Sequence, residues 1–71
     1  MITNQTMTKL KQVRLAQPFH MTQKELSIRS GVKLRTVQDY EQGHRKLSKA
    51  AFPTVRGLMI ALNCEYDDIM D

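Results

Sequence analysis

The stretch that decides the fold is residues 23–42, which read QKELSIRSGVKLRTVQDYEQ. One helical pattern ends at Gly31, and a second begins three residues later. Two short helices that cross steeply need a small residue at the crossing, a glycine in the turn and apolar residues that face a shared core. Ser27, Gly31 and the pair Val37 and Tyr40 occupy those positions. The spacing therefore predicts two helices joined by a tight turn.

Upstream of this stretch, the sequence predicts a helix over residues 7–17. Apolar residues such as Leu10 follow helical spacing there, and Pro18 ends the pattern because the residue before a proline avoids helical dihedral angles. Thr22 followed by Glu25 forms a capping box, which marks the start of the next helix. The helices expected in the central stretch span residues 22–30 and 34–42.

Downstream, Gly43 ends the third helix, and residues 44–49 are basic and loop-like. Pro53 suits the first turn of a fourth helix, over residues 53–62, which Asn63 closes in a left-handed conformation. The spacing of Tyr66, Ile69 and Met70 predicts a short final helix. No strand-like alternation is present, so the expected fold is all-α, a compact bundle of about five short helices. We expect a flexible arm over residues 1–6 and one domain over residues 7–71.

The remaining composition argues against several classes of protein. At 71 residues the chain has room for one small domain and not for a separate ligand-sensing one. Cys64 is the single cysteine, so no internal disulfide is possible, and its spacing from His20 and His44 does not fit a metal site. We expect no cofactor, no small-molecule ligand and no enzymatic activity, because no nucleophile, base and orienting partner can be assembled. The absence of a long apolar run or a secretory signal predicts a cytoplasmic protein without a membrane segment.

Basic charge is concentrated in the body of the chain. The formal net charge is +4, but four of the seven acids lie in the last seven residues: Glu65, Asp67, Asp68 and Asp71. Residues 1–64 therefore carry eleven lysines and arginines against three acids. Such a one-sided positive field attracts a polyanion, and nucleic acid is the leading candidate. A single-strand binder would need an aromatic stacking platform, whereas Phe19, Phe52, Tyr40 and Tyr66 are expected in the core or at its rim.

The twenty-residue spacing is that of a helix-turn-helix unit. Moreover, the segments TQKEL (22–26), SGV (30–32) and YEQG (40–43) resemble the signature of the phage-repressor-like (XRE, Cro/C1-type) family over nearly the whole chain. The resemblance implies a lambda-repressor-like DNA-binding domain with an ion pair between Arg14 and Glu41. Three features depart from the family pattern: Lys33 replaces a common serine or threonine cap, Ser27 replaces the usual alanine, and the link from Arg14 to Gln23 is longer than in the most compact members.

The resemblance places the helix over residues 34–42 in the major groove of double-stranded DNA. The residues then expected to face base edges are Lys33, Leu34, Arg35, Gln38, Asp39 and Gln42. Arg35 suits a bidentate contact with guanine, Gln38 one with adenine, and Leu34 the methyl group of thymine. Asp39 has two open roles, because it could accept from a cytosine amino group or orient Arg35 through an i, i+4 ion pair.

Polar and basic residues around that helix are expected to bind DNA phosphates. They are Gln23, Lys24, Thr36, His44, Arg45, Lys46 and Lys49. Gln23 and Lys24 stand at the positive end of the second helix, and the others flank the third helix or follow it in the basic loop. Such contacts carry affinity and little sequence information. For Lys49, a solvated surface charge is the alternative interpretation.

The predicted function is that of a sequence-specific transcriptional regulator, a repressor that occludes its operator. A homodimer on a palindromic operator is expected, since a small monomer makes few base contacts. The candidate dimer-interface residues are Met59, Tyr66, Ile69 and Met70, with core packing as their alternative role. The resemblance suggests a bacterial, phage or mobile-element origin. The alternative function is a protein-binding module with the same fold, such as an antitoxin-like partner or an adaptor.

Overall fold

A computed structural model describes residues 7–18 and 21–70 of the chain. Every regular element within these ranges is a helix, which confirms the expected all-α class. The elements are α1 (Lys9–Leu15), α2 (Gln23–Ser30), α3 (Leu34–Gln42), the short 3-10 helix η2 (Leu47–Lys49), α4 (Phe52–Leu62) and α5 (Tyr66–Ile69). The expected arm at residues 1–6 lies outside the described residues, as do Phe19, His20 and Asp71.

Helix α1 is shorter than predicted at both ends. The hydroxyl of Thr8 accepts a hydrogen bond from the backbone N–H of Lys11, so Thr8 is the N-cap and Met7 precedes the helix. At the other end Ala16 is the C-cap. Gln17 lies outside the helix because it precedes Pro18, whose ring disfavours helical dihedral angles at that position.

The predicted caps of the central helices are confirmed. Thr22 accepts from the N–H of Glu25, and the Glu25 carboxylate accepts from the N–H of Thr22, which completes the capping box of α2. Gly31, Gly43 and Asn63 end α2, α3 and α4 with φ angles of 75°, 82° and 52°. These left-handed conformations turn the chain sharply after each helix.

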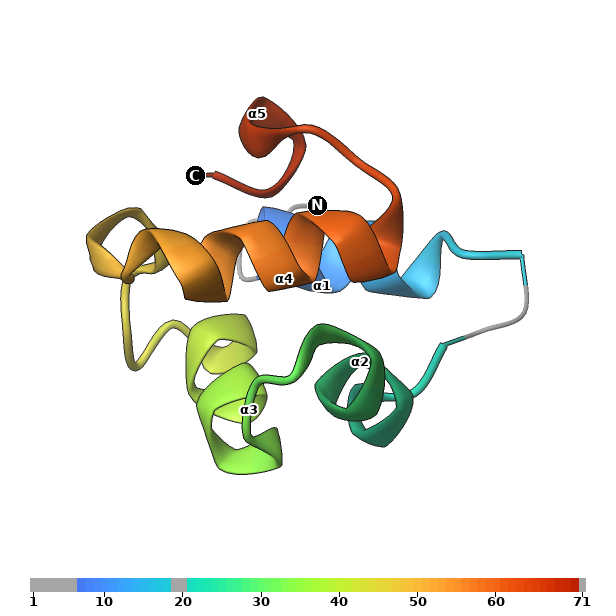
Figure 1. The fold of residues 1–71 in the computed structure, drawn as a ribbon, viewed down its shortest axis with the longest axis horizontal. Coiled ribbons are helices and arrows are strands. Elements are labelled where there is room, and N and C mark those ends of the chain that lie inside the picture. Colours follow the sequence, from blue (N-terminus) through green and yellow to red (C-terminus); the bar gives the residue numbers. More distant parts are fainter. Residues whose placement is uncertain (1–6, 19–20, 71) are drawn as a thin grey trace, which may run out of the picture.

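Helix α4 is the centre of the arrangement. Figure 1 shows α4 running across the molecule, with α5 on one side of it and α2 and α3 on the other, while α1 lies behind it. Gly57 lets α4 approach α2 closely, because a Cβ atom at this position would lie 2.4 Å from the carbonyl oxygen of Ser30. The close contact fixes α2 and α3 as a pair beneath α4.

Apolar side chains from every helix pack together in one core. The buried apolar residues are Leu10, Met21, Leu26, Val32, Val37, Tyr40, Leu47, Val55, Leu58, Leu62, Ile69 and Met70. Leu47 anchors the basic loop through η2, a helical turn that the sequence did not predict. Phe52 differs from its expected place, because 67% of it is exposed at the start of α4.

Candidate nucleic-acid interface

The turn between α2 and α3 is held by side-chain hydrogen bonds. The Ser27 hydroxyl donates to the carbonyl of Val32 at 2.6 Å, and the N–H of Val32 donates to the Ser30 hydroxyl at 3.2 Å. The serine at the helix crossing is therefore small enough for the packing and also bonds to the turn, which an alanine would not do. This contact fixes the direction in which α3 leaves the turn.

A buried ion pair ties α3 to α1 and confirms the expectation from the family pattern. Arg14 donates from Nε to Oε2 of Glu41 at 2.6 Å and from Nη2 to Oε1 at 2.9 Å. Its Nη1 donates to the carbonyl of Met21 at 2.9 Å. The two side chains are 9% and 1% exposed, so the pair is shielded from water and its bidentate geometry sets the orientation of α3.

Gln23 extends this network to α2. Its Nε2 donates to Oε1 of Glu41 at 3.0 Å, and its Oε1 accepts from Nε2 of Gln38 at 3.5 Å, the outer limit for a hydrogen bond. The side chain expected at a phosphate is thus engaged inside the chain. Its position beside Gln38, an expected base reader, was not foreseen from the sequence.

Helix α3 divides its residues between the core and the surface. Val37, Tyr40 and Glu41 are buried. The expected base readers lie outside the core: Lys33, Leu34, Arg35 and Gln42 are exposed, and Gln38 and Asp39 are half-buried. Lys33 is the N-cap residue of α3, and within the described part of the chain its side chain makes no capping hydrogen bond. Helix α3 thus presents one continuous polar side to solvent.

The carboxylate of Asp39 lies among three basic side chains. Its Oδ1 is 3.7 Å from Nε of Arg35 and 3.8 Å from Nδ1 of His44, and its Oδ2 is 3.8 Å from Nε of Arg45. The i, i+4 pair with Arg35 matches one of the two roles considered for Asp39. Its contacts with the loop residues His44 and Arg45 were not predicted, although the left-handed turn at Gly43 brings the N–H of His44 to the Asp39 carbonyl in a local C-cap pattern.

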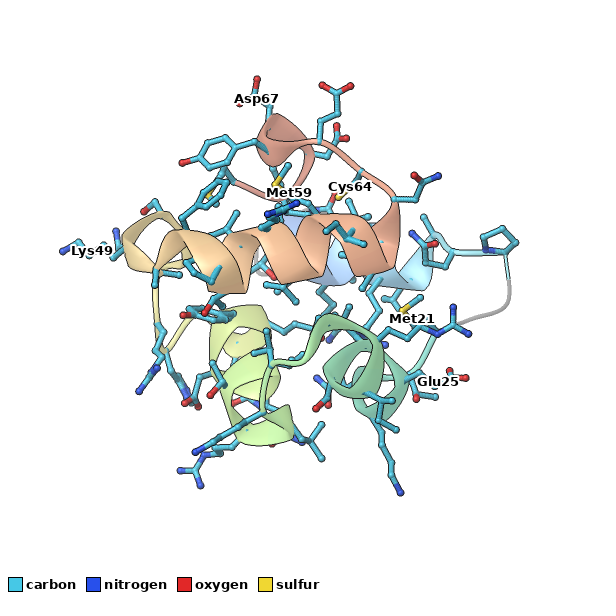
Figure 2. The ribbon with its side chains drawn as sticks, viewed as in Figure 1. Met21, Glu25, Lys49, Met59, Cys64 and Asp67 are labelled. Atoms are coloured by element: carbon cyan, nitrogen blue, oxygen red, sulfur yellow. The ribbon has the colours of Figure 1, made fainter. Side chains whose placement is uncertain are left out.

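A groove beside α3 gathers several of the expected phosphate-binding residues. It has a volume of about 670 Å³ and runs between the turn after α2 and the start of α4. Thr36, Arg45 and Lys49 are among the residues that line it, together with Lys33, which was predicted to face a base edge. Lys49 points outward at the level of α4, away from α3 (Figure 2). Lys24, at the start of α2, is exposed and does not line this groove.

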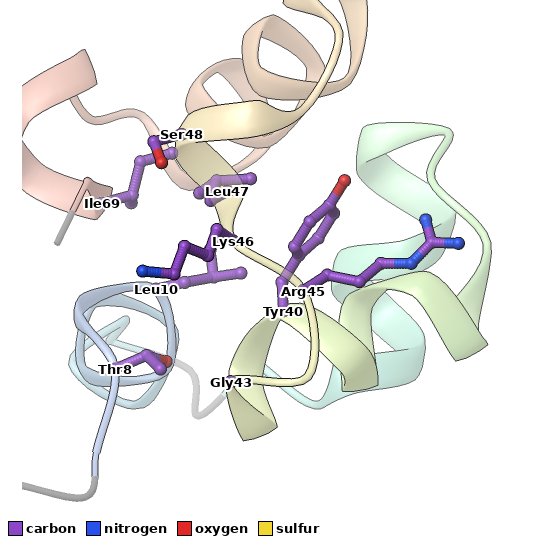
Figure 3. Close-up of a pocket in the computed structure, with 9 residues that line it drawn as sticks. All are labelled: Thr8, Leu10, Tyr40, Gly43, Arg45, Lys46, Leu47, Ser48 and Ile69. Carbon is purple, nitrogen blue, oxygen red and sulfur yellow. The ribbon is translucent and has the colours of Figure 1, made fainter.

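Neighbouring loop residues point in different directions. Figure 3 shows Arg45 extending beside α3 and Lys46 extending toward Leu10 of α1. Arg45 contacts Asp39 on the α3 side. Arg45 and Lys46 both line a smaller pocket of about 250 Å³ between α1, the end of α3, the loop and α5. The loop therefore divides its positive charge between the α3 side and the α1 side of the molecule.

Acidic residues occupy the opposite end of the molecule. Glu65, Asp67 and Asp68 lie at α5, and Figure 2 shows Asp67 on the other side of α4 from Glu25 of α2. The positive side chains around α3 are therefore separated from the acidic helix by α4. This separation favours a polyanion at the α3 side of the molecule over the α5 side.

The expected dimer-interface residues fall into two groups. Ile69 and Met70 are 1% and 9% exposed, so they lie in the core of the single chain and have little surface left for a second copy. Tyr66 is 48% exposed, and Met59 is half-buried. Phe52 and Ile60, which the sequence analysis did not select, are 67% and 66% exposed on α4. Their spacing of eight residues places them on the same side of that helix.

Chemistry-bearing groups are sparse outside this region. Burial, and secondarily the Asp68 carboxylate, raise the pKa of the Cys64 thiol, which favours its neutral form. Among residues 7–18 and 21–70, no cluster of three histidines, cysteines or carboxylates is placed to hold a metal ion. None of the helices in those ranges has the length and hydropathy of a membrane span.

Comparison with known protein families gives one result that covers most of the molecule. A family model described as helix-turn-helix matches residues 10–69, from α1 to the end of α5. Neither the curated proteins nor the solved structures give a match. The matched range holds the Arg14–Glu41 pair, the turn at Gly31 and the polar side of α3. The chain therefore belongs to the helix-turn-helix family of the Cro/C1 (XRE) type and is a DNA-binding regulator.

Proposed function

We propose that this protein is a sequence-specific repressor that places α3 in the major groove of its operator and blocks access to the DNA. The observation that carries the proposal is the division of α3 into a buried side, fixed by the Arg14–Glu41 pair, and an exposed polar side. A helix held rigidly by its buried side can present its outer residues in one register to a row of base edges.

Arg35 is the principal base reader in this proposal. Its side chain is 85% exposed, and the guanidinium fork matches the two acceptors of guanine. Gln38 and Gln42 follow Arg35 at spacings of three and seven residues, which keeps them on the same side of α3. Leu34, at the start of α3, contacts a thymine methyl group.

The residues around α3 hold the DNA backbone. Thr36 and Arg45 line one groove, which supports contacts from both with the DNA backbone. Lys33, a predicted base reader, lines the same groove, and Lys49 lines it but points away from α3. Lys24 reaches the backbone from the start of α2, and His44 reaches it from the loop. Lys46 lies on the α1 side and adds positive charge without a contact beside α3. Exposed lysine and arginine contacts of this kind supply affinity that falls as salt concentration rises.

The proposed assembly on DNA is a homodimer. Phe52 and Ile60 of α4 and Tyr66 of α5 are exposed apolar residues outside α3, so a second copy that covers them leaves both copies of α3 free. Two half-sites about one helical turn apart, or about 34–36 Å, then form a palindrome. Occlusion is the simplest mode of control, since the DNA face and the dimer face use most of the exposed surface of so small a domain.

Selection of bound duplexes from a random DNA pool tests the proposal, with Arg35→Ala and Arg45→Ala as matched variants. Both variants lose one arginine, but only Arg35 is assigned to a base. We expect the natural chain to enrich one palindromic motif and Arg35→Ala to relax one position of each half-site. Arg45→Ala should weaken all sequences alike and lower the salt slope by about one. Absence of any enriched motif would contradict the proposal and favour a protein partner.

A further inference from the structure

We infer that Asp39 is a positioning residue that holds one base-reading side chain and two phosphate-binding side chains in a single arrangement, and that it thereby sets the ratio of specific to non-specific DNA binding. The inference rests on the proposed function and deepens it. The feature that carries it is the placement of one carboxylate between Arg35 of α3 and His44 and Arg45 of the following loop.

The contacts use the inner nitrogen of each basic side chain. Asp39 is approached by Nε of Arg35, by Nε of Arg45 and by Nδ1 of His44, at 3.7 to 3.8 Å. The terminal nitrogens of each guanidinium and Nε2 of the imidazole are not among these contacts. These are the donors that bind guanine bidentately or reach a phosphate oxygen. The carboxylate therefore directs these side chains without using the atoms that would contact DNA.

The backbone of Asp39 fixes the loop independently of the carboxylate. Its carbonyl oxygen accepts from the N–H of His44 at 2.9 Å and from the N–H of Arg45 at 3.3 Å. Asparagine at position 39 would keep this carbonyl and nearly the same side-chain size. Asp39→Asn therefore removes the charge that directs the basic side chains and leaves the hydrogen bonds that place the loop.

The two arginine ion pairs are weak, and the His44 contact is an ion pair only when the imidazole is protonated. The value of the three contacts lies in their sharing one carboxylate. The three basic side chains are 60–85% exposed, whereas the Asp39 side chain is 21% exposed. Exposed pairs of this kind add little to stability. Side chains that are already oriented lose less freedom on binding, which favours a duplex whose bases match that orientation. On an unmatched duplex the same restraint, together with repulsion between the carboxylate and the phosphates, opposes binding.

The loss of the Asp39 charge should change the affinity for matched and for unmatched DNA in opposite directions. Removing the charge should weaken binding to the matched duplex, because Arg35 is no longer oriented, and should strengthen binding to unmatched DNA. Simple repulsion by Asp39 would instead make the variant tighter on both duplexes. A general structural role would make it weaker on both.

The test measures dissociation constants by fluorescence anisotropy for the selected duplex and a scrambled duplex at two salt concentrations. We expect Asp39→Asn to bind the selected duplex about tenfold more weakly and the scrambled duplex up to about threefold more tightly. Asp67→Asn is the control, because it removes one negative charge from α5, across α4 from α3. It should change both constants by less than about twofold, since distant exposed charges are screened. Thermal melts should show the same stability for Asp39→Asn and the natural chain.

A double-mutant cycle identifies the route of the effect. In an Arg35→Gln background, the loss caused by Asp39→Asn on the selected duplex should shrink from about tenfold to about threefold, because residues that act together are not additive. An equal loss in both backgrounds, or an unchanged ratio of the two dissociation constants in Asp39→Asn, would overturn the inference while leaving the proposed function intact. If the natural chain itself did not distinguish the duplexes, the proposed function would fail and the inference with it.

Discussion

Replacing Glu41 with glutamine removes a negative charge from the centre of the fold and keeps the size of the side chain. The guanidinium of Arg14 would remain buried, with its side chain 9% exposed, and would lose its charged partner. Removing one partner of a buried ion pair costs about 3–5 kcal/mol. We expect about 3 kcal/mol here, the lower end of that range, because the glutamine oxygen can still accept a hydrogen bond from Arg14.

This loss is large for a chain of 71 residues. At about 0.05–0.15 kcal/mol per residue, the free energy of unfolding of such a domain is about 4–11 kcal/mol. Urea denaturation followed by far-UV circular dichroism measures the change. Glu25→Gln is the matched control, since glutamine also completes a capping box and Glu25 is exposed, and it should cost less than about 0.5 kcal/mol. Equal losses from Glu41→Gln and Glu25→Gln would refute the reasoning.

Three further perturbations test other parts of the structure. Gly57→Ala should lower the free energy of unfolding by about 1–3 kcal/mol in a thermal or urea melt. The reason is that the added Cβ atom would lie 2.4 Å from the Ser30 carbonyl oxygen. A gain in stability, which alanine gives at an open helical position, would contradict the packing of α4 on α2. Cys64 should react with iodoacetamide more slowly in the folded chain than in urea near pH 9.0, because burial and then Asp68 raise the thiol pKa. The folded state favours the neutral thiol, so the thiol stabilises the fold at pH values below its pKa in the unfolded chain. This stabilisation is lost as the pH rises through the higher pKa of the folded chain. Equal reaction rates in the folded and unfolded chains would count against burial of the thiol. Ile60→Asp should leave the melting temperature unchanged, because Ile60 is exposed. In analytical ultracentrifugation it should halve the mass of protein bound per palindromic duplex. An unchanged mass would show that α4 is not part of the dimer interface.

The sequence predicted the helices of this fold because their ends carry local signals. The capping box at Thr22 and Glu25 and the left-handed residues Gly31, Gly43 and Asn63 each depend on nearby backbone atoms alone. The prediction erred where a boundary had two acceptable solutions, as at Thr8, which serves equally as a helical residue or as a cap. The hydrogen bond that the Lys11 N–H donates to the Thr8 hydroxyl shows that Thr8 is the N-cap.

The sequence predicted which residues belong to the candidate site, but not which of their side chains contact one another. The surface position of Arg35 and Gln42 follows from helical periodicity on α3 once Val37 and Tyr40 are assigned to the core. The cluster at Asp39 depends on the path of the loop, which hydrogen bonds from His44 and Arg45 to the Asp39 carbonyl set locally. The directions of the three basic side chains above that loop are a tertiary property that sequence spacing does not contain.

Other features had a signal in the sequence that was not used. An isolated glycine within an apolar helix, as at Gly57, commonly marks a close helix contact, and here it lies against α2. Ile69 and Met70 were predicted at a dimer surface as part of an apolar patch on the last helix, but both are buried in the core of the single chain. Their burial shifts the proposed interface to Phe52, Ile60 and Tyr66.

The central claim is that the polar side of α3 and the loop after it form the surface that reads DNA. Titration of the ¹⁵N-labelled protein with the selected duplex, followed by NMR, tests this claim most directly. The largest amide shifts are expected at Leu34, Arg35, Gln38 and Arg45, with smaller ones at the start of α2. Shifts confined to α4 and α5, or no difference between the selected and a scrambled duplex, would contradict the claim.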